Sequence, residues 1–141
     1  MMDRIAPLRG FVRSMTALLN QTSNERTVLA QGRAHLSVLI ADDAWLPPAF
    51  TTPRSDRYAQ YLLHCDALER FSVVSFVWGP GQRTPVHDHT VWGLVGVLRG
   101  AENCDAFDLQ AGRPVATGRP HVVKRGGSEA APPPVGGGLR V

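Results

Sequence analysis

The sequence predicts a mainly β domain that begins with two helices, and three observations lead to this fold class. The chain has 141 residues, which is the usual size of one domain. Residues 1–41 carry apolar side chains at helical spacing, whereas residues 55–125 contain short runs rich in β-branched and aromatic residues. Closely spaced antiparallel strands of this kind favour a small β-barrel or sandwich. We therefore expect one domain over residues 1–125, followed by an irregular tail over residues 126–141.

Two amphipathic helices are expected in the N-terminal part. Apolar residues recur at spacings of three and four between residues 5 and 20, which places them on one face of a helix. A second periodic stretch follows Thr22 and Glu25, which have the spacing of a capping box, and extends to Ile40. Gly32 lies inside this stretch and weakens the helix locally. The pattern predicts two helices joined by a short turn.

Four strands are expected after a connection that is rich in proline. Residues 42–53 hold Pro47, Pro48 and Pro53, which cannot donate backbone hydrogen bonds and favour an irregular segment. Turn residues then close each run of β-forming residues. The expected strands are Arg57 to His64, Phe71 to Trp78, Val91 to Leu98 and Glu102 to Leu109.

The C-terminal tail has a different composition. Gly126 to Val141 is rich in glycine and proline and poor in large apolar side chains, so we expect no strand there. One interpretation is a flexible terminus. The other is a truncated or frame-shifted product, which would leave the barrel incomplete at the C terminus with an open sheet edge.

The composition excludes several classes of protein. Apolar residues make up 43% and charged residues 19%, which is typical of a globular domain, and no apolar run is long enough to span a membrane. The net charge of +3 is scattered, so no basic stripe for nucleic acid is visible. Cys65 and Cys104 lack CxxC spacing and are interpreted as small, buried, reduced residues. We expect a cytoplasmic protein without nucleic-acid or membrane partners, and the oligomeric state stays open.

The densest group of residues suited to chemistry lies between the second and third expected strands. His87 and His89 are two positions apart in this segment. Side chains two apart in an extended chain point to the same side, so both imidazoles can face one metal ion. The alternative is a polar loop whose histidines face water.

The residues around this pair resemble the first metal-binding motif of the cupin superfamily. Gly81 and Gly100 frame the two histidines at the spacing of that motif. The glutamate that often serves as a further ligand is absent, because Gly93 and Leu94 occupy the positions where it would stand. Together with the segments Trp78 to Gly81 and Trp92 to Gly100, this absence resembles the bacterial branch of the cysteine dioxygenase family, in particular 3-mercaptopropionate dioxygenase.

This resemblance implies a cupin-type β-barrel (jelly roll) and one non-haem Fe²⁺ ion held by three histidines. The family adds O₂ to a thiol and forms a sulfinic acid. His87 and His89 match two of the three ligands, and His121 is the one histidine that follows them. His121 comes earlier than the family spacing implies and is a poor third ligand. His35 and His64 are interpreted as structural histidines.

The resemblance also implies substrate-binding residues on the first strand. Tyr58 and Gln60 fall where the family presents a tyrosine and a residue that contacts the substrate carboxylate, and Trp78 would line the pocket mouth. Cysteine-specific members resemble this pattern with arginine, whereas mercaptopropionate-type members have glutamine. The alternative is a polar pair on an exposed sheet face. Because Gly93 stands where vertebrate-type members have a crosslinked cysteine, no such crosslink is expected.

Two functional hypotheses from different classes follow. The first is an iron-dependent thiol dioxygenase that acts on cysteine or, in preference, on 3-mercaptopropionate, so that its partners are O₂ and a small thiol carboxylate. The second is a truncated, catalytically inactive cupin that binds a metal or a small acid weakly. A cupin isomerase with another metal is less favoured, because those sites generally keep the glutamate.

Overall fold

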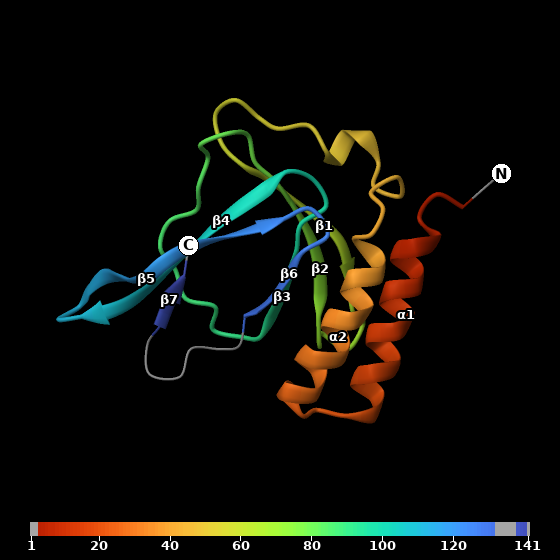
Figure 1. The fold of residues 1–141 in the computed structure, drawn as a ribbon. Coiled ribbons are helices and arrows are strands. Elements are labelled where there is room, and N and C mark those ends of the chain that lie inside the picture. The colour runs from red at the N-terminus through yellow and green to blue at the C-terminus, as the bar shows by residue number, and fades with distance from the viewer. Residues whose placement is uncertain (1–2, 132–137, 141) are drawn as a thin grey trace.

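Two helices and a group of short strands make up the computed structural model, which describes residues 3–131 and 138–140 (Figure 1). Helices α1 (Ala6–Gln21) and α2 (Glu25–Leu39) lie side by side and run in opposite directions. A short 3₁₀ helix, η1 (Pro48–Phe50), leads toward the strands. Helices followed by antiparallel strands agree with the predicted class, a mainly β fold with N-terminal helices.

Both predicted helices are confirmed to within about one residue at their ends, but the cap of the second is not the expected one. The side chain of Asn24 accepts a hydrogen bond from the Thr27 amide at 3.0 Å, so Asn24 is the N-cap of α2. Thr22 instead accepts a hydrogen bond from the Asn24 amide at 3.0 Å. The capping-box prediction for Thr22 and Glu25 was therefore wrong, because α2 begins at Glu25 itself.

The four predicted strands are confirmed, with changed ends, and three further strands are present among the described residues. The strands are β1 (Ala59–Cys65), β2 (Ser72–Val77), β3 (Gly93–Gly96), β4 (Ala101–Gln110), β5 (Arg113–Lys124), β6 (Ser128–Ala131) and β7 (Gly138–Arg140). They form three small antiparallel sheets: β1 with β2, β3 with β6, and β4 between β5 and β7. These sheets do not close into a barrel within the part of the chain that the structure describes, so the predicted barrel is not formed there.

The prediction that residues 126–141 form no strand was wrong. β6 pairs with β3 over four residue pairs, and β7 pairs with β4. Gly126, with φ of 78°, forms the turn before β6, and its amide donates to the carbonyl oxygen of Val97 at 2.8 Å. Backbone pairing of this kind needs no large apolar side chain, so the small residues of β6 can still form a strand. Residues 132–137 and 141 of the expected irregular tail lie outside the described residues.

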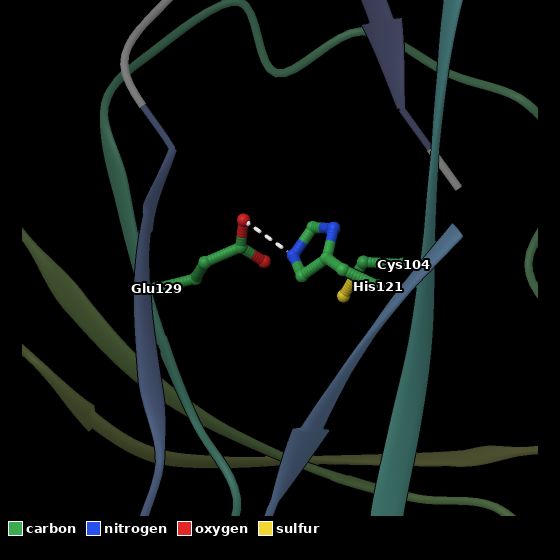
Figure 2. A group of neighbouring side chains, drawn as sticks. All are labelled: Cys104, His121 and Glu129. Atoms are coloured by element: carbon green, nitrogen blue, oxygen red, sulfur yellow. Dashed lines mark ion pairs between the residues drawn. The ribbon is translucent and has the colours of Figure 1, made fainter. Parts of the chain in front are cut away.

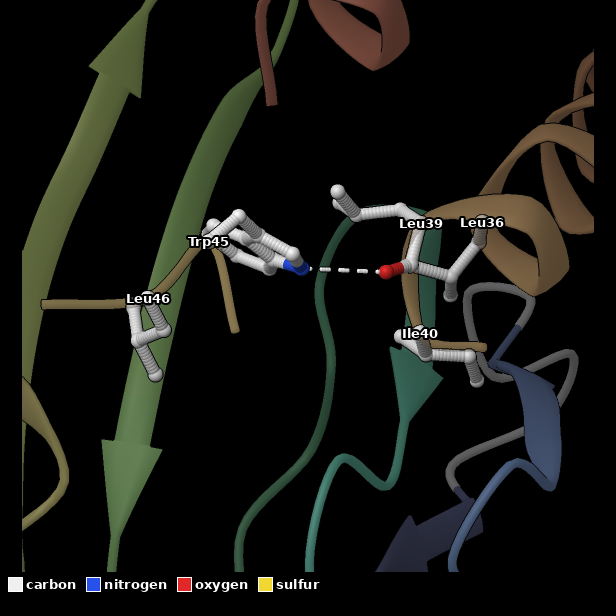
Figure 3. Packing of buried hydrophobic residues seen from close by; sticks show 5 residues of the cluster. All are labelled: Leu36, Leu39, Ile40, Trp45 and Leu46. Atoms are coloured by element: carbon white, nitrogen blue, oxygen red, sulfur yellow. Dashed lines mark hydrogen bonds between the residues drawn. The ribbon is translucent and has the colours of Figure 1, made fainter. Parts of the chain in front are cut away.

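The larger apolar core joins α2 and the segment after it to the strands. It consists of five buried residues, shown in Figure 3: Leu36, Leu39, Ile40, Trp45 and Leu46. The Trp45 indole N–H donates to the Leu39 carbonyl oxygen at 3.0 Å, which satisfies one of the carbonyls that the end of a helix leaves without a partner. Leu63 of β1 and Leu94 of β3 pack against this cluster. The helical layer therefore supports β1 and also β3, the strand that follows the histidine segment.

Gly32, expected to weaken α2, is explained by close packing. It is buried, and a Cβ atom at this position would lie 2.8 Å from Cδ1 of Leu94 and 3.3 Å from Sδ of Met15. Met15 belongs to the second apolar cluster, with Leu18 and Val28, which holds α1 against α2. The glycine therefore allows the helix to approach β3 closely.

A partly buried ion pair lies in the turn between β1 and β2. The Arg70 guanidinium donates to both carboxylate oxygens of Asp66, at 2.8 and 3.2 Å, and the Asp66 side chain is only 8% exposed. The hydrogen bonds from Arg70 hold the pKa of Asp66 below its usual value, against the opposing effect of desolvation. The turn predicted here is confirmed.

Within the described residues, neither α1 nor α2 is long and apolar enough to cross a lipid bilayer.

Candidate functional site

The loop between β2 and β3 brings His87 and His89 together. Their Nε2 atoms lie 3.0 Å apart, and the two ring centroids are separated by 4.9 Å. His87 is exposed and His89 is half-buried, so the pair remains accessible from solvent. The two imidazoles thus converge on one point, which is the geometry that the two-residue spacing predicts.

The hydrogen bond on the far side of the His87 ring sets its tautomer. Nδ1 of His87 lies 2.7 Å from the carbonyl oxygen of Pro85. A carbonyl oxygen can only accept, so Nδ1 carries the proton and Nε2 of the neutral ring presents a lone pair toward His89. Two arrangements satisfy that lone pair: a proton on Nε2 of His89, or a cation bound between the rings. A backbone carbonyl on Nδ1 is the usual support for a histidine that binds metal through Nε2.

One metal ion can contact both nitrogens at metal–imidazole bond lengths of about 2.1 Å, because the two Nε2 atoms lie only 3.0 Å apart.

The predicted substrate residues lie on one face of the β1–β2 sheet. The rings of Tyr58 and Trp78 meet edge to face with centroids 5.6 Å apart. Phe76 joins them, with ring centroids 6.3 Å from Tyr58 and 5.6 Å from Trp78, and it stands opposite Gln60 in the β1–β2 register. Gln60 is exposed and Phe76 is 47% exposed. This face continues with Leu62, which is 67% exposed.

Phe76 is a residue of this face that no sequence motif indicated. Phe76 and Trp78 are two residues apart, so the alternation of side chains along a strand places both on one face. That alternation was the available signal. The resulting surface is an exposed sheet face that combines three aromatic rings with one amide.

A second group of potential metal ligands comes from three other strands. Cys104 on β4 stands opposite His121 on β5, and Glu129 lies on β6 (Figure 2). One ligand atom from each lies within 4.8 Å of the other two. His121 Nε2 and Glu129 Oε1 are 2.9 Å apart. Within the described residues, this is the group of three that the fold brings together, and neither His87 nor His89 belongs to it.

A further carboxyl group lies near this second group. Glu102, two residues before Cys104 on β4, is half-buried. Burial and the neighbouring Glu129 carboxylate raise the pKa of Glu102 above its ordinary value, burial being the larger cause. Two carboxylates from different strands therefore lie close to the thiol and the imidazole.

The structure corrects the interpretation of both cysteines. Cys65 is exposed and Cys104 is half-buried, so neither is the small buried residue that was expected. Cys65 is the last residue of β1, where its side chain faces away from the core. The structural interpretation of His64 agrees with its ring contact to Phe71, at 5.5 Å between centroids. His35 is half-buried on α2.

A search of protein-family models finds none that matches this chain.

Proposed function

We propose that this chain is a cupin-type thiol dioxygenase of the cysteine dioxygenase kind, in which His87 and His89 hold Fe²⁺. The observation that carries the proposal is the convergence of the two Nε2 atoms at 3.0 Å, with Nδ1 of His87 held by the Pro85 carbonyl oxygen. The bound ferrous ion would supply the binding of a thiolate and of O₂. The reaction is balanced by its two substrates alone, since one thiol and one O₂ give one sulfinic acid.

The remaining roles fall to residues of the β1–β2 face. The amide of Gln60 donates a neutral hydrogen bond to the carboxylate of the substrate. Tyr58, Phe76 and Trp78 offer aromatic surface to the apolar stem of the substrate. Gln60 lacks the charge-assisted fork of an arginine, so the proposal favours 3-mercaptopropionate over cysteine.

Oxygen uptake tests the proposal directly. The full chain, loaded with Fe²⁺ under anaerobic conditions, is mixed with O₂ and either 3-mercaptopropionate or cysteine, and sulfinate is quantified. We expect one sulfinate per O₂ consumed. His87→Ala and His89→Ala should each lower iron retention by more than the 10- to 100-fold that loss of an outer-shell partner costs. His35→Ala, which changes a half-buried histidine on α2, is the matched control and should keep activity.

Two results would contradict the proposal. Iron retention and turnover that survive in both His87→Ala and His89→Ala would refute the assignment of these two ligands. Turnover of cysteine faster than 3-mercaptopropionate would refute the role of Gln60. In that case Gln60→Arg should leave the ratio of the two rates unchanged, whereas the proposal expects this variant to shift the ratio toward cysteine.

The second candidate is a cupin that binds a metal or a small acid without turnover. The observation that favours it is the ligand count, because within the described residues no His, Cys, Asp or Glu joins His87 and His89 in a group of three. Two histidines alone hold a metal less firmly than three. Iron that binds to the pair without O₂ uptake would establish this second function in place of the first.

A further inference from the structure

We propose that Cys104, His121 and Glu129 form a zinc site that is separate from the His87 and His89 pair. The three side chains come from β4, β5 and β6, so they are neighbours only because the strands pair in the observed registers (Figure 2). Their ligand atoms lie within 4.8 Å of one another, and side-chain movements of about 1 Å would bring all three within bonding distance of one ion. No residue of this site takes part in the proposed oxygenase chemistry.

The chemical classes of the three ligand atoms favour Zn²⁺. A thiolate, an imidazole and a carboxylate are the three ligand classes that Zn²⁺ uses in proteins, whereas Ca²⁺ and Mg²⁺ require oxygen donors throughout. The thiolate also disfavours a hard cation. Three protein ligands leave the fourth tetrahedral position to water. His121 is 51% exposed, so solvent reaches the site from the side of the imidazole.

Zinc would replace the contact between the imidazole and the carboxylate. His121 Nε2 and Glu129 Oε1 are 2.9 Å apart, whereas two tetrahedral ligands with bonds of about 2.0–2.1 Å lie about 3.4 Å apart. Moving these side chains apart by roughly half an ångström requires no change of backbone. A partly exposed His–Glu pair contributes little to stability, so its loss is a small cost.

The carboxyl group of Glu102, close to Glu129, favours a cation at this site. Glu129 lies close enough to Glu102 for their carboxylates to repel each other, and both are half-buried. A divalent ion on Glu129 offsets that repulsion. Zinc binding also deprotonates the Cys104 thiol, so it releases a proton to the buffer.

The test uses Co²⁺ as a spectroscopic substitute and Zn²⁺ as the competitor. The protein is the full chain carrying His87→Ala and His89→Ala, which removes the other metal pair. We expect one Co²⁺ per chain, with a near-ultraviolet thiolate-to-cobalt charge-transfer band and the strong visible bands of a four-coordinate ion, both abolished by one equivalent of Zn²⁺. Cys104→Ala should remove the charge-transfer band, while Cys65→Ala, the matched control, should keep it.

Two further variants test the other two ligands, His121 and Glu129. His121→Ala should weaken Co²⁺ binding at least 10-fold. Glu129→Gln, which keeps the shape of the side chain, should weaken binding while the thiolate band persists at saturating metal. Each variant is first checked by far-ultraviolet circular dichroism. A thiolate band that persists in Cys104→Ala, or Co²⁺ binding unchanged in His121→Ala and Glu129→Gln, would overturn the proposal. So would the failure of the parent chain to bind Co²⁺ at all. None of these results depends on oxygenase activity.

Discussion

The Trp45 side chain provides a measurable test of what holds the end of α2 in the core. It is 4% exposed, and its indole N–H donates to the carbonyl oxygen of Leu39 at the end of α2 (Figure 3). The substitution Trp45→Phe removes this donor and three ring atoms while keeping an aromatic side chain. The Leu39 carbonyl is then left in the core without this hydrogen bond.

The magnitude follows from two effects. A buried acceptor that loses its partner costs about 1–3 kcal/mol. The two ring carbons that disappear cost about 0.8 kcal/mol each in lost burial. Together they lower the free energy of unfolding by about 2.5–4.5 kcal/mol, which is a large share of the roughly 5–15 kcal/mol that stabilises a typical domain.

Urea unfolding followed by far-ultraviolet circular dichroism measures this change. We expect a lower midpoint at an unchanged m-value, because the surface exposed on unfolding is nearly the same. Val38→Ala on α2 is the control, since Val38 is 79% exposed and its truncation should change stability by less than about 0.5 kcal/mol. If Trp45→Phe were no more destabilising than Val38→Ala, the assigned role of the indole in holding the end of α2 would be refuted.

Three further predictions concern local features. Because the pKa of Asp66 is lower in the folded protein than its unfolded value of 3.8, its pairing with Arg70 stabilises the fold fully at a pH above 3.8. This stabilisation is lost as the pH falls below 3.8 and through the lower pKa of the folded state. Urea midpoints measured from pH 6 to pH 3 should therefore fall less steeply in Asp66→Asn than in the unmodified chain, and parallel curves would contradict this. Gly127→Ala should lower the free energy of unfolding by about 1–3 kcal/mol, because the added Cβ would lie 2.8 Å from a backbone carbonyl oxygen. Gly10→Ala, in open space on α1, should instead raise it by about 0.5–1 kcal/mol. Thermal unfolding in which both variants shift stability in the same direction would be inconsistent with this packing. Asn24→Ala should lower unfolding free energy by about 1 kcal/mol through loss of the α2 cap, and an unchanged urea midpoint would exclude that cap.

Local pattern was sufficient for the helices, for four strands and for one part of the site. The apolar spacing between residues 5 and 20 depends on the geometry of a single helix, and the helix forms there. The two-residue separation of His87 and His89 likewise brings their rings together without help from distant residues. The alternation of Tyr58 with Gln60 is of the same kind.

The cap of α2 and the exposure of Cys65 show where local pattern was insufficient. Several polar residues before Glu25 could have capped the helix, and the observed backbone selects Asn24. A cysteine that follows a strand of apolar residues resembles a core position, yet Cys65 ends β1 on the exposed side. In both cases the outcome depends on where one element ends and how it packs.

The composition of the chain and its local spacing determined the order of helices and strands and the histidine pair. Only the tertiary structure decided the group of Cys104, His121 and Glu129. A shift in the β4–β5 register between Cys104 and Ala106 places the cysteine opposite the histidine, and β6 then adds Glu129 by pairing with β3. The physical reason is that strand register and sheet partners are set by backbone hydrogen bonds between distant segments, which leave little signal in the side chains of either strand alone.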